Sequence, residues 1–292
     1  MYTPTTFQAH LLRAVQNLAL DTAEKRSRPG ATPMLSAQIT TGDATVAELG
    51  AVAVAVGIPR SWVDYVQVAG QQGQRWRPDQ QMLSGQHSTR SELVTAHTAR
   101  IRDLQQMAGT AAAYARRGTP DPEAAAKVRQ IIGITWQCAG AVGHALSLTR
   151  EERRQCWQPG SQQWTSALAA TIDSLDDDAL IRRWKAICSR DFTPLAVPII
   201  VLQGAGITHD DIARQLPLSP DQMVDHTAIA LSGPRRTPTV DIAIDNAERE
   251  GAAITSAIDA AGLTTSPTLF SVLDRAPTDG SESHGADTEA TP

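Results

Sequence analysis

One stretch combines residue types that could hold a metal ion. His209-Asp210-Asp211 places an imidazole beside two carboxylates, a combination found in metal-dependent phosphohydrolases, and His144 and Asp241 are conceivable further ligands. An ordinary helix start explains the same residues better. Thr208 would cap the helix and the two acids would favour its positive end. The sequence therefore predicts a helix start at this point and no metal site.

A second stretch, residues 197–206, could be a buried strand that leads into a glycine-rich phosphate turn. The third glycine of the dinucleotide-binding fingerprint is missing, because position 209 is His, and no Gly-Lys-Ser/Thr follows. The surrounding sequence also shows no alternation of strands and helices. We therefore predict no nucleotide cofactor.

The cysteines and histidines form no recognisable catalytic set. Cys138, Cys156 and Cys188 are odd in number and far apart, which argues against a disulfide framework. Two neighbouring arginines could lower the pKa of Cys156, but Trp157 beside it favours a buried, structural thiol. The seven His residues lack the i, i+4 spacing of a helical zinc site, and no Gly-x-Ser-x-Gly motif occurs. We therefore expect that the protein is not an enzyme, unless polar residues from separate helices converge to form a site.

The best candidate for binding is an Arg- and Gln-rich corner over residues 43–77. Arginine and glutamine can bond to phosphates and base edges, and an exposed Trp between two arginines could stack on a base. The predicted nucleic-acid-binding residues are Arg60, Gln67, Gln71, Arg75, Trp76 and Arg77. The alternative is that Trp62 and Trp76 anchor the core while the arginines are merely solvated.

A neighbouring segment could enlarge this basic surface. The predicted helix over 90–117 carries five arginines against two acids, and it would add to a basic face if it lay beside residues 60–77. The five are Arg90, Arg100, Arg102, Arg116 and Arg117.

The elements that carry these residues are predicted to form an all-α multi-helix bundle. Ala, Leu, Gln, Arg and Glu are plentiful, whereas Phe and Tyr number only three each. Apolar periodicity and caps predict about ten helices. After a loop from residue 28 to Gly42, Thr45 and Glu48 are expected to form a capping box, and Thr149 to cap a short helix. The expected helices cover 4–25, 43–56, 60–68, 90–117, 123–146, 150–157, 162–174, 177–189, three pieces within 194–231, 240–260 and 263–274.

A helix-turn-helix-like corner recurs three times, at Gly57-Ile58-Pro59, Gly206-Ile207-Thr208 and Gly262-Leu263-Thr264. Glycine accepts the left-handed conformation, the aliphatic residue packs back, and Pro or Thr begins a new helix. Ordinary bundles use the same turn. Residues 195–231 contain the best match and resemble bacterial helix-turn-helix regulators in general. However, 191–231 holds five acids and only Arg214 as a base, which favours a structural or protein-binding role there.

Charge and hydropathy set the remaining expectations. The net charge is −5, and four acids with no base follow residue 275, so the rest of the chain is close to neutral. We expect an N-terminal helical unit over 1–77, a bundle over 78–232, C-terminal helices over 233–275 and a disordered acidic tail over 276–292. No run is apolar enough for a membrane span, and the cytoplasm is the expected location.

These patterns predict a non-enzymatic DNA-binding or regulatory accessory protein that acts through the 43–77 corner without a cofactor. DNA is the expected partner. The main alternative is a helical adaptor that binds another protein or a second copy of itself. Binding to DNA should weaken steeply as salt rises, whereas an apolar protein interface should barely respond.

Overall fold

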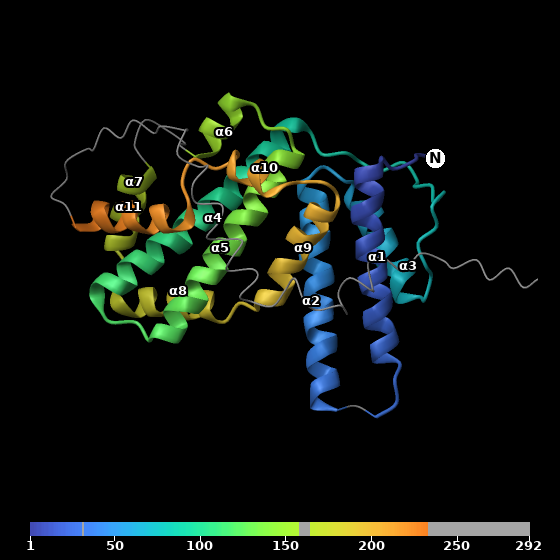
Figure 1. Cartoon of the computed structure of the whole chain (residues 1–292), viewed down its shortest axis with the longest axis horizontal. Coiled ribbons are helices and arrows are strands. Elements are labelled where there is room, and N and C mark those ends of the chain that lie inside the picture. The colour runs from blue at the N-terminus through green and yellow to red at the C-terminus, as the bar shows by residue number, and fades with distance from the viewer. Residues whose placement is uncertain (31, 158–163, 233–292) are drawn as a thin grey trace, which may run out of the picture.

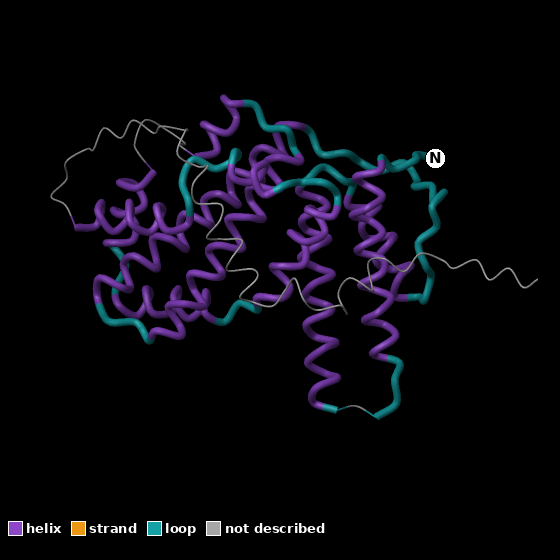
Figure 2. Tube along the Cα trace, in the orientation of Figure 1, coloured by secondary structure: helices purple, strands orange, loops and turns teal. Residues whose placement is uncertain are grey.

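Helices make up nearly all the regular structure of the computed structural model, which describes residues 1–30, 32–157 and 164–232 (Figures 1 and 2). The described segments contain no strand, only an isolated antiparallel bridge between Tyr2 and Met82, so the all-α prediction is confirmed. The predicted helices at 240–260 and 263–274, the corner at Gly262 and the acidic tail lie outside these residues. The eleven helices of the described segments are α1 (Thr6–Arg26), α2 (Pro33–Ala55), α3 (Arg60–Gln71), α4 (Arg90–Arg117), α5 (Pro122–Ala145), α6 (Arg150–Trp157), α7 (Trp164–Asp173), α8 (Asp177–Cys188), α9 (Phe192–Gly204), α10 (His209–Ala213) and α11 (Pro220–Ser232).

The second helix starts ten residues earlier than the sequence predicted. Thr32 caps α2 by accepting a hydrogen bond from the Leu35 amide at 3.1 Å, and Pro33 fits the first turn. The predicted loop to Gly42 and the predicted cap at Thr45 are therefore wrong. Thr45 is buried inside α2, where its hydroxyl donates to the Thr41 carbonyl at 2.7 Å. Gly42, which suggested a loop, instead lets α2 approach Thr22 of α1 closely.

The helices α1, α2 and α3 pack together at one end of the molecule (Figure 1). The third helix extends three residues beyond its predicted end, because Gly70 lies inside it at the contact with α1. A Cβ atom at Gly70 would lie 2.3 Å from the Gln16 carbonyl oxygen and 2.8 Å from the Ala19 Cβ. Only a glycine allows the two helices to approach this closely. We call α1, α2 and α3 the three-helix unit.

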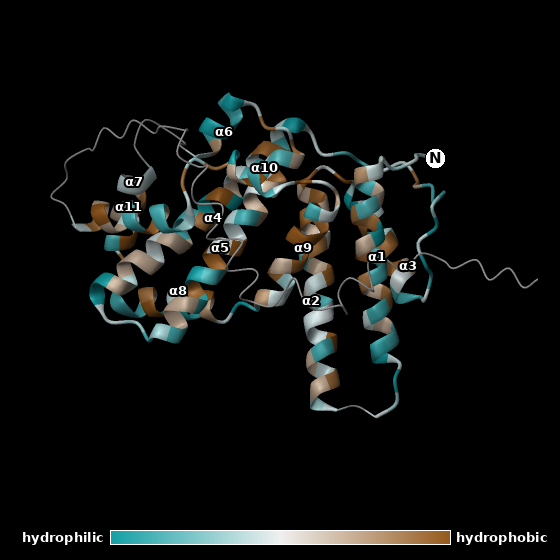
Figure 3. Ribbon diagram, viewed as in Figure 1, coloured by the Kyte–Doolittle hydropathy of each residue, from teal (hydrophilic) through white to brown (hydrophobic). Residues whose placement is uncertain are grey.

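The long helices α4 and α5 form the predicted hairpin, with α4 spanning the predicted residues 90–117. Apolar α9 lies between α2 and α5, as the brown ribbon of Figure 3 shows. The apolar core runs without a break from Leu12 in α1 through Leu104 in α4 to Leu202 in α9. Residues 197–206 are part of this helix and its corner, so the alternative of a strand with a phosphate turn is wrong.

The two predicted corners within the described residues are built alike. Gly57 and Gly206 have φ of +94° and +100°. In each corner the following aliphatic amide, from Ile58 or Ile207, donates to the carbonyl five residues earlier at 3.1 or 3.2 Å. A further corner of this kind lies between α5 and α6, where Ser147 has a φ of +49° and the Leu148 amide donates to the Gly143 carbonyl, five residues earlier, at 3.3 Å. The sequence gives no glycine signal for this corner, because a serine stands where the other two have glycine.

Replacing Ser147 with glycine is expected to stabilise the protein by about 1 kcal/mol, because a left-handed conformation strains a residue that carries a Cβ. The change removes no side-chain hydrogen bond to the described residues, since the Arg90 contact uses the Ser147 backbone carbonyl. Urea unfolding followed by circular dichroism measures the effect. A Ser147→Ala variant, which keeps the Cβ, should show no such gain, and equal midpoints for the two variants would contradict the strain.

Candidate nucleic-acid interface

The corner between α2 and α3 fixes the orientation of α3 through buried apolar contacts. Trp62, Val63 and Val66 of α3 are at most 4% exposed and belong to the continuous core. Gly50 allows α2 to approach α3, because a Cβ there would already lie 3.1 Å from a Val63 methyl group. One face of α3 is therefore held by α1 and α2, and its opposite face is left for other contacts.

The chain that follows α3 folds back over the first turn of the same helix. The indole Nε1 of Trp62 donates to the Leu83 carbonyl at 2.8 Å, and a Cβ at Gly85 would lie 2.8 Å from both Pro59 and Ser61. Met82 is buried, and its backbone pairs with Tyr2. We call residues 82–87 the strap. Trp62 is thus a core anchor, as the alternative interpretation of the sequence proposed.

The outward face of α3 is apolar in its centre. Ser61, Tyr65, Val68 and Gln72 follow one stripe at helical spacing and are all exposed. The exposed fractions of Tyr65 and Val68 are 51% and 48%, so about half of each large apolar side chain contacts solvent. Asp64 is exposed beside this stripe. We call Tyr65 and Val68 the central pair. Neither residue is among the predicted binding residues, although the sequence shows their three-residue spacing on one helix face.

The predicted arginines belong to two parts of the chain. Arg60 begins α3, whereas Arg75 and Arg77 follow its last turn, in the chain that returns towards the first turn of the same helix. All three are exposed, and no described carboxylate lies within 4.0 Å of their guanidinium groups. No ion pair among the described residues therefore engages their charges.

The other predicted residues differ in how accessible they are. Gln71 is exposed in the last turn of α3, and Gln67 is half-buried. Trp76 is half-buried and packs against the core, so much of its ring is engaged inside the protein. Gln16 of α1 fixes the chain just before Trp76 by donating from Nε2 to the Gln74 carbonyl at 2.9 Å.

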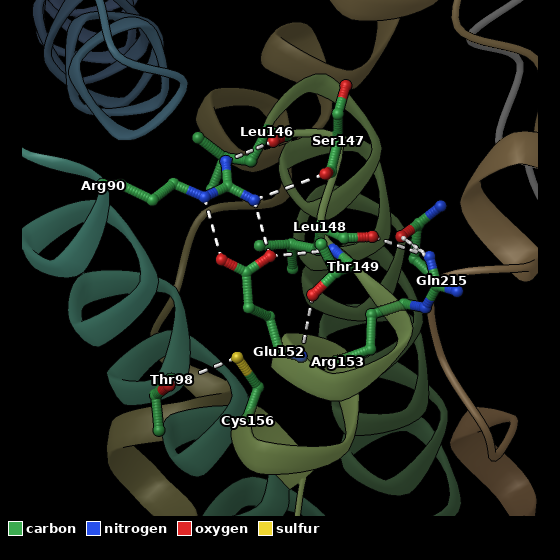
Figure 4. A network of polar contacts seen from close by, with 10 residues as sticks. All are labelled: Arg90, Thr98, Leu146, Ser147, Leu148, Thr149, Glu152, Arg153, Cys156 and Gln215. Atoms are coloured by element: carbon green, nitrogen blue, oxygen red, sulfur yellow. Dashed lines mark hydrogen bonds and ion pairs between the residues drawn. The ribbon is translucent and has the colours of Figure 1, made fainter.

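Helix α4 does not extend a basic face, because three of its arginines are paired with acids. Arg116 bonds to Asp173 at 2.7 Å and Arg117 to Asp177 at 2.9 Å. Arg90 binds both carboxylate oxygens of Glu152, at 2.9 and 2.7 Å, and also donates to the Leu146 and Ser147 carbonyls (Figure 4). These arginines join α4 to α5, α6, α7 and α8, so the expected enlargement of the basic surface is wrong for them.

The second helix-turn-helix-like unit, residues 195–231, is acidic, and the helix that follows its glycine corner is short. Helix α10 has five residues, and Thr208 and Asp211 form its capping box. Hydrogen bonds from the side chain and backbone of Thr208 lower the pKa of Asp211 to about 2. His144 lies 3.8 Å from this carboxylate, but no group of three His, Cys, Asp or Glu side chains among the described residues could hold a metal ion. The predicted helix start is confirmed.

Burial raises the pKa of all three thiols, which disfavours the reactive thiolate form. Burial raises the pKa of the Cys156 thiol, which accepts a hydrogen bond from Thr98 at 3.3 Å (Figure 4). The adjacent Arg153 and Arg154 do not face it. Arg153 donates to the Leu148 carbonyl, and Arg154 pairs with Glu151. This arrangement fits the structural role that the sequence suggested for Cys156.

Comparison with protein-family models, curated proteins and solved structures finds no match to this chain. Within the described segments, no individual helix has both the length and the apolar composition of a membrane span. Helices α8 and α9 reach these limits only when taken together, with a bend of 55° between them.

Proposed function

We propose that this chain is a non-enzymatic, cytoplasmic accessory protein that binds duplex DNA through α3. The observation that supports this most directly is the three-helix unit itself. Its glycine corner holds one face of α3 in the core, and three exposed arginines with no acidic partner among the described residues lie at the start of α3 and in the chain that follows it. Helix-turn-helix proteins use such a second helix to enter the major groove. Arg60, Arg75 and Arg77 would bond to phosphates.

Removal of all three arginines tests the proposal. The variant in which Arg60, Arg75 and Arg77 are replaced by Ala should bind a mixed-sequence duplex about tenfold more weakly at low salt. It should also lower the slope of log affinity against log salt by about 2.7, since each phosphate contact contributes about 0.9. Fluorescence anisotropy of a labelled duplex across a salt series measures both quantities.

A matched control removes three arginines from elsewhere on the surface. Arg150, Arg182 and Arg183 are exposed, and none of them forms an ion pair within the described segments. Their replacement changes the net charge equally and should leave the salt slope almost unchanged. The absence of any binding by the unaltered chain at low salt, or an equal loss in both triple variants, would contradict an interface at α3.

The central pair supports a second candidate, which is an adaptor that binds another protein. Tyr65 and Val68 are apolar and half exposed, and Tyr65 belongs to a residue type that is enriched at protein interfaces. Such binding would depend little on salt. The salt series therefore distinguishes the two candidates.

A further inference from the structure

A group of cations on α8 has no acidic partner within the described part of the chain. Arg182, Arg183 and Lys185 lie within one turn of this helix, and all three are exposed. No described carboxylate comes within 4.0 Å of their charged nitrogens. Arg182 and Lys185 are three residues apart and therefore lie on the same side of α8. We call these three residues the α8 cations.

The charges next to the α8 cations leave the surface positive. Burial raises the pKa of the Cys188 thiol at the end of α8, and the nearby charge of exposed Lys127 in α5 opposes this shift. Asp178 lies one turn before Arg182, but the two form no ion pair. Asp177 is engaged by Arg117. The balance of these charges is positive, so the surface suits an acidic partner.

Helix α11 ends close to the start of α8. Arg116 of α4 donates to the Leu231 carbonyl in the last turn of α11. The next residue, Arg117, bonds to Asp177 in the first turn of α8 at 2.9 Å. The α8 cations lie about 8 to 12 Å further along α8, because a helix rises about 1.5 Å per residue. Figure 1 shows α8 and α11 at one end of the molecule, opposite the three-helix unit.

The part of the sequence that follows α11 is acidic. Residues 233–292 hold ten acids and four bases, whereas residues 1–232 hold 21 acids and 22 bases. Attraction between opposite charges extends over about 10 Å at 0.1 M salt. Charge therefore favours a contact between this C-terminal segment, residues 233–292, and an exposed basic surface of the same chain.

Asp241, Asp245 and Glu248 are the first acids after α11. In the helix that the sequence predicts over 240–260 they lie on one stripe, four and three residues apart. Asp241 follows Ser232 by nine residues, which can span about 30 Å, whereas α8 is about 18 Å long. The four acids after residue 275 are held on a much longer tether, which lowers their effective concentration at α8. The first three acids are therefore the best placed to reach the α8 cations.

We propose that Asp241, Asp245 and Glu248 bind to the α8 cations, so that the chain's own C-terminal segment occupies this surface. The contact consists of exposed ion pairs, which weaken as salt rises. It keeps the α8 cations from attracting phosphates at a place remote from α3. The contact does not depend on DNA binding, and its test uses the chain without DNA.

Carbodiimide cross-linking tests the contact in the full chain, because it joins a lysine amine to a carboxylate only when the two groups touch. Peptide mass spectrometry should find Lys185 joined to Asp241, Asp245 or Glu248 at low salt. Little of this product should form at about 1 M salt, where the screening length falls to about 3 Å. The reaction is run on a mixture of isotope-labelled and unlabelled chains, so that links within a chain join only peptides of equal label.

Removal of two arginines separates charge attraction from simple tethering. Arg182→Gln combined with Arg183→Gln keeps Lys185 and the three acids. The yield of cross-linked peptide should nevertheless fall about fourfold, since each exposed ion pair changes an equilibrium about twofold. The matched control combines Arg28→Gln with Arg150→Gln, which removes two other exposed arginines that form no ion pair with described residues. It should leave the yield unchanged, and circular dichroism checks that both variants fold.

The proposal fails if Lys185 joins none of the three acids at low salt, or if it joins the acids after residue 275 instead. Links between labelled and unlabelled chains would overturn it in favour of a contact between two copies. An unchanged yield without Arg182 and Arg183 would also overturn it, because tethering alone would then produce the links. Absence of DNA binding in the salt series would contradict the proposed function and leave this contact unaffected.

Discussion

Replacing Gly70 with alanine is expected to destabilise the protein by about 3 kcal/mol, because the added methyl group would overlap the backbone of α1. The new Cβ atom would lie 2.3 Å from the Gln16 carbonyl oxygen and 3.1 Å from the Leu20 nitrogen. Neither atom can move without shifting the whole helix. Urea unfolding followed by circular dichroism measures the change. A smaller cost would mean that α1 and α3 can move apart without a loss of stability.

Gly133→Ala provides the matched control for this prediction. Gly133 also lies inside a long helix, α5, but no described atom outside that helix lies within 4 Å of the position its Cβ would occupy. Alanine has the higher helix propensity, so this change should stabilise the protein by about 0.5–1 kcal/mol. Opposite signs for the two substitutions would show that the effect at Gly70 arises from helix packing. A loss of stability at both positions would contradict this explanation.

Replacing Arg90 with alanine is expected to cost about 2 kcal/mol of unfolding free energy, because one side chain bonds to three separate groups. The variant leaves the Leu146 carbonyl without this donor and Glu152 without its bidentate partner. The pair is partly exposed, with side-chain exposures of 46% and 21%, so solvent screening keeps the cost moderate. Urea unfolding measures this cost. Arg154→Ala, which breaks a more exposed pair with Glu151, should change stability by less than about 0.5 kcal/mol.

The contact between Arg90 and Glu152 also makes the stability of the protein depend on pH. The hydrogen bond from Arg90, followed by that from the Thr149 backbone, lowers the pKa of Glu152 to about 2. A lowered pKa in the folded state stabilises the protein above the ordinary glutamate range, and this contribution disappears as the pH falls towards 2. The stability difference between the unaltered chain and Glu152→Gln should therefore shrink between about pH 5 and pH 2. A difference that stays constant over this range would exclude Glu152 as its source.

Local signals in the sequence predicted most of the helices and the two glycine corners. The bounds of α4 and the caps at Thr149 and Thr208 follow from adjacent residues, so the sequence contained what was needed. The start of α2 was missed because Thr, Gly and Asp between Thr40 and Asp43 are typical of a loop. In the structure, contact with Thr22 makes Gly42 useful inside a helix. Helix propensity depends on local sequence and therefore cannot predict that tertiary contact.

The candidate site was only partly predictable, for the same reason. Exposure of Arg60, Arg75 and Arg77 agrees with the sequence, but the position of Arg75 and Arg77 depends on how the chain folds back after α3. The pairing of Arg90 with Glu152 joins residues 62 positions apart, so composition alone could not show that this charge is already engaged. The strap over Trp62 likewise depends on a long-range fold of the chain.

Because core packing on one side and the strap at its first turn hold α3, the backbone of this helix is in place before any partner arrives. A partner that docks on this helix would immobilise few additional groups, and the entropy lost on association would be correspondingly small. A single short helix could then bind measurably with a modest contact area. Recognition of this kind would be close to rigid-body docking, with little induced fit.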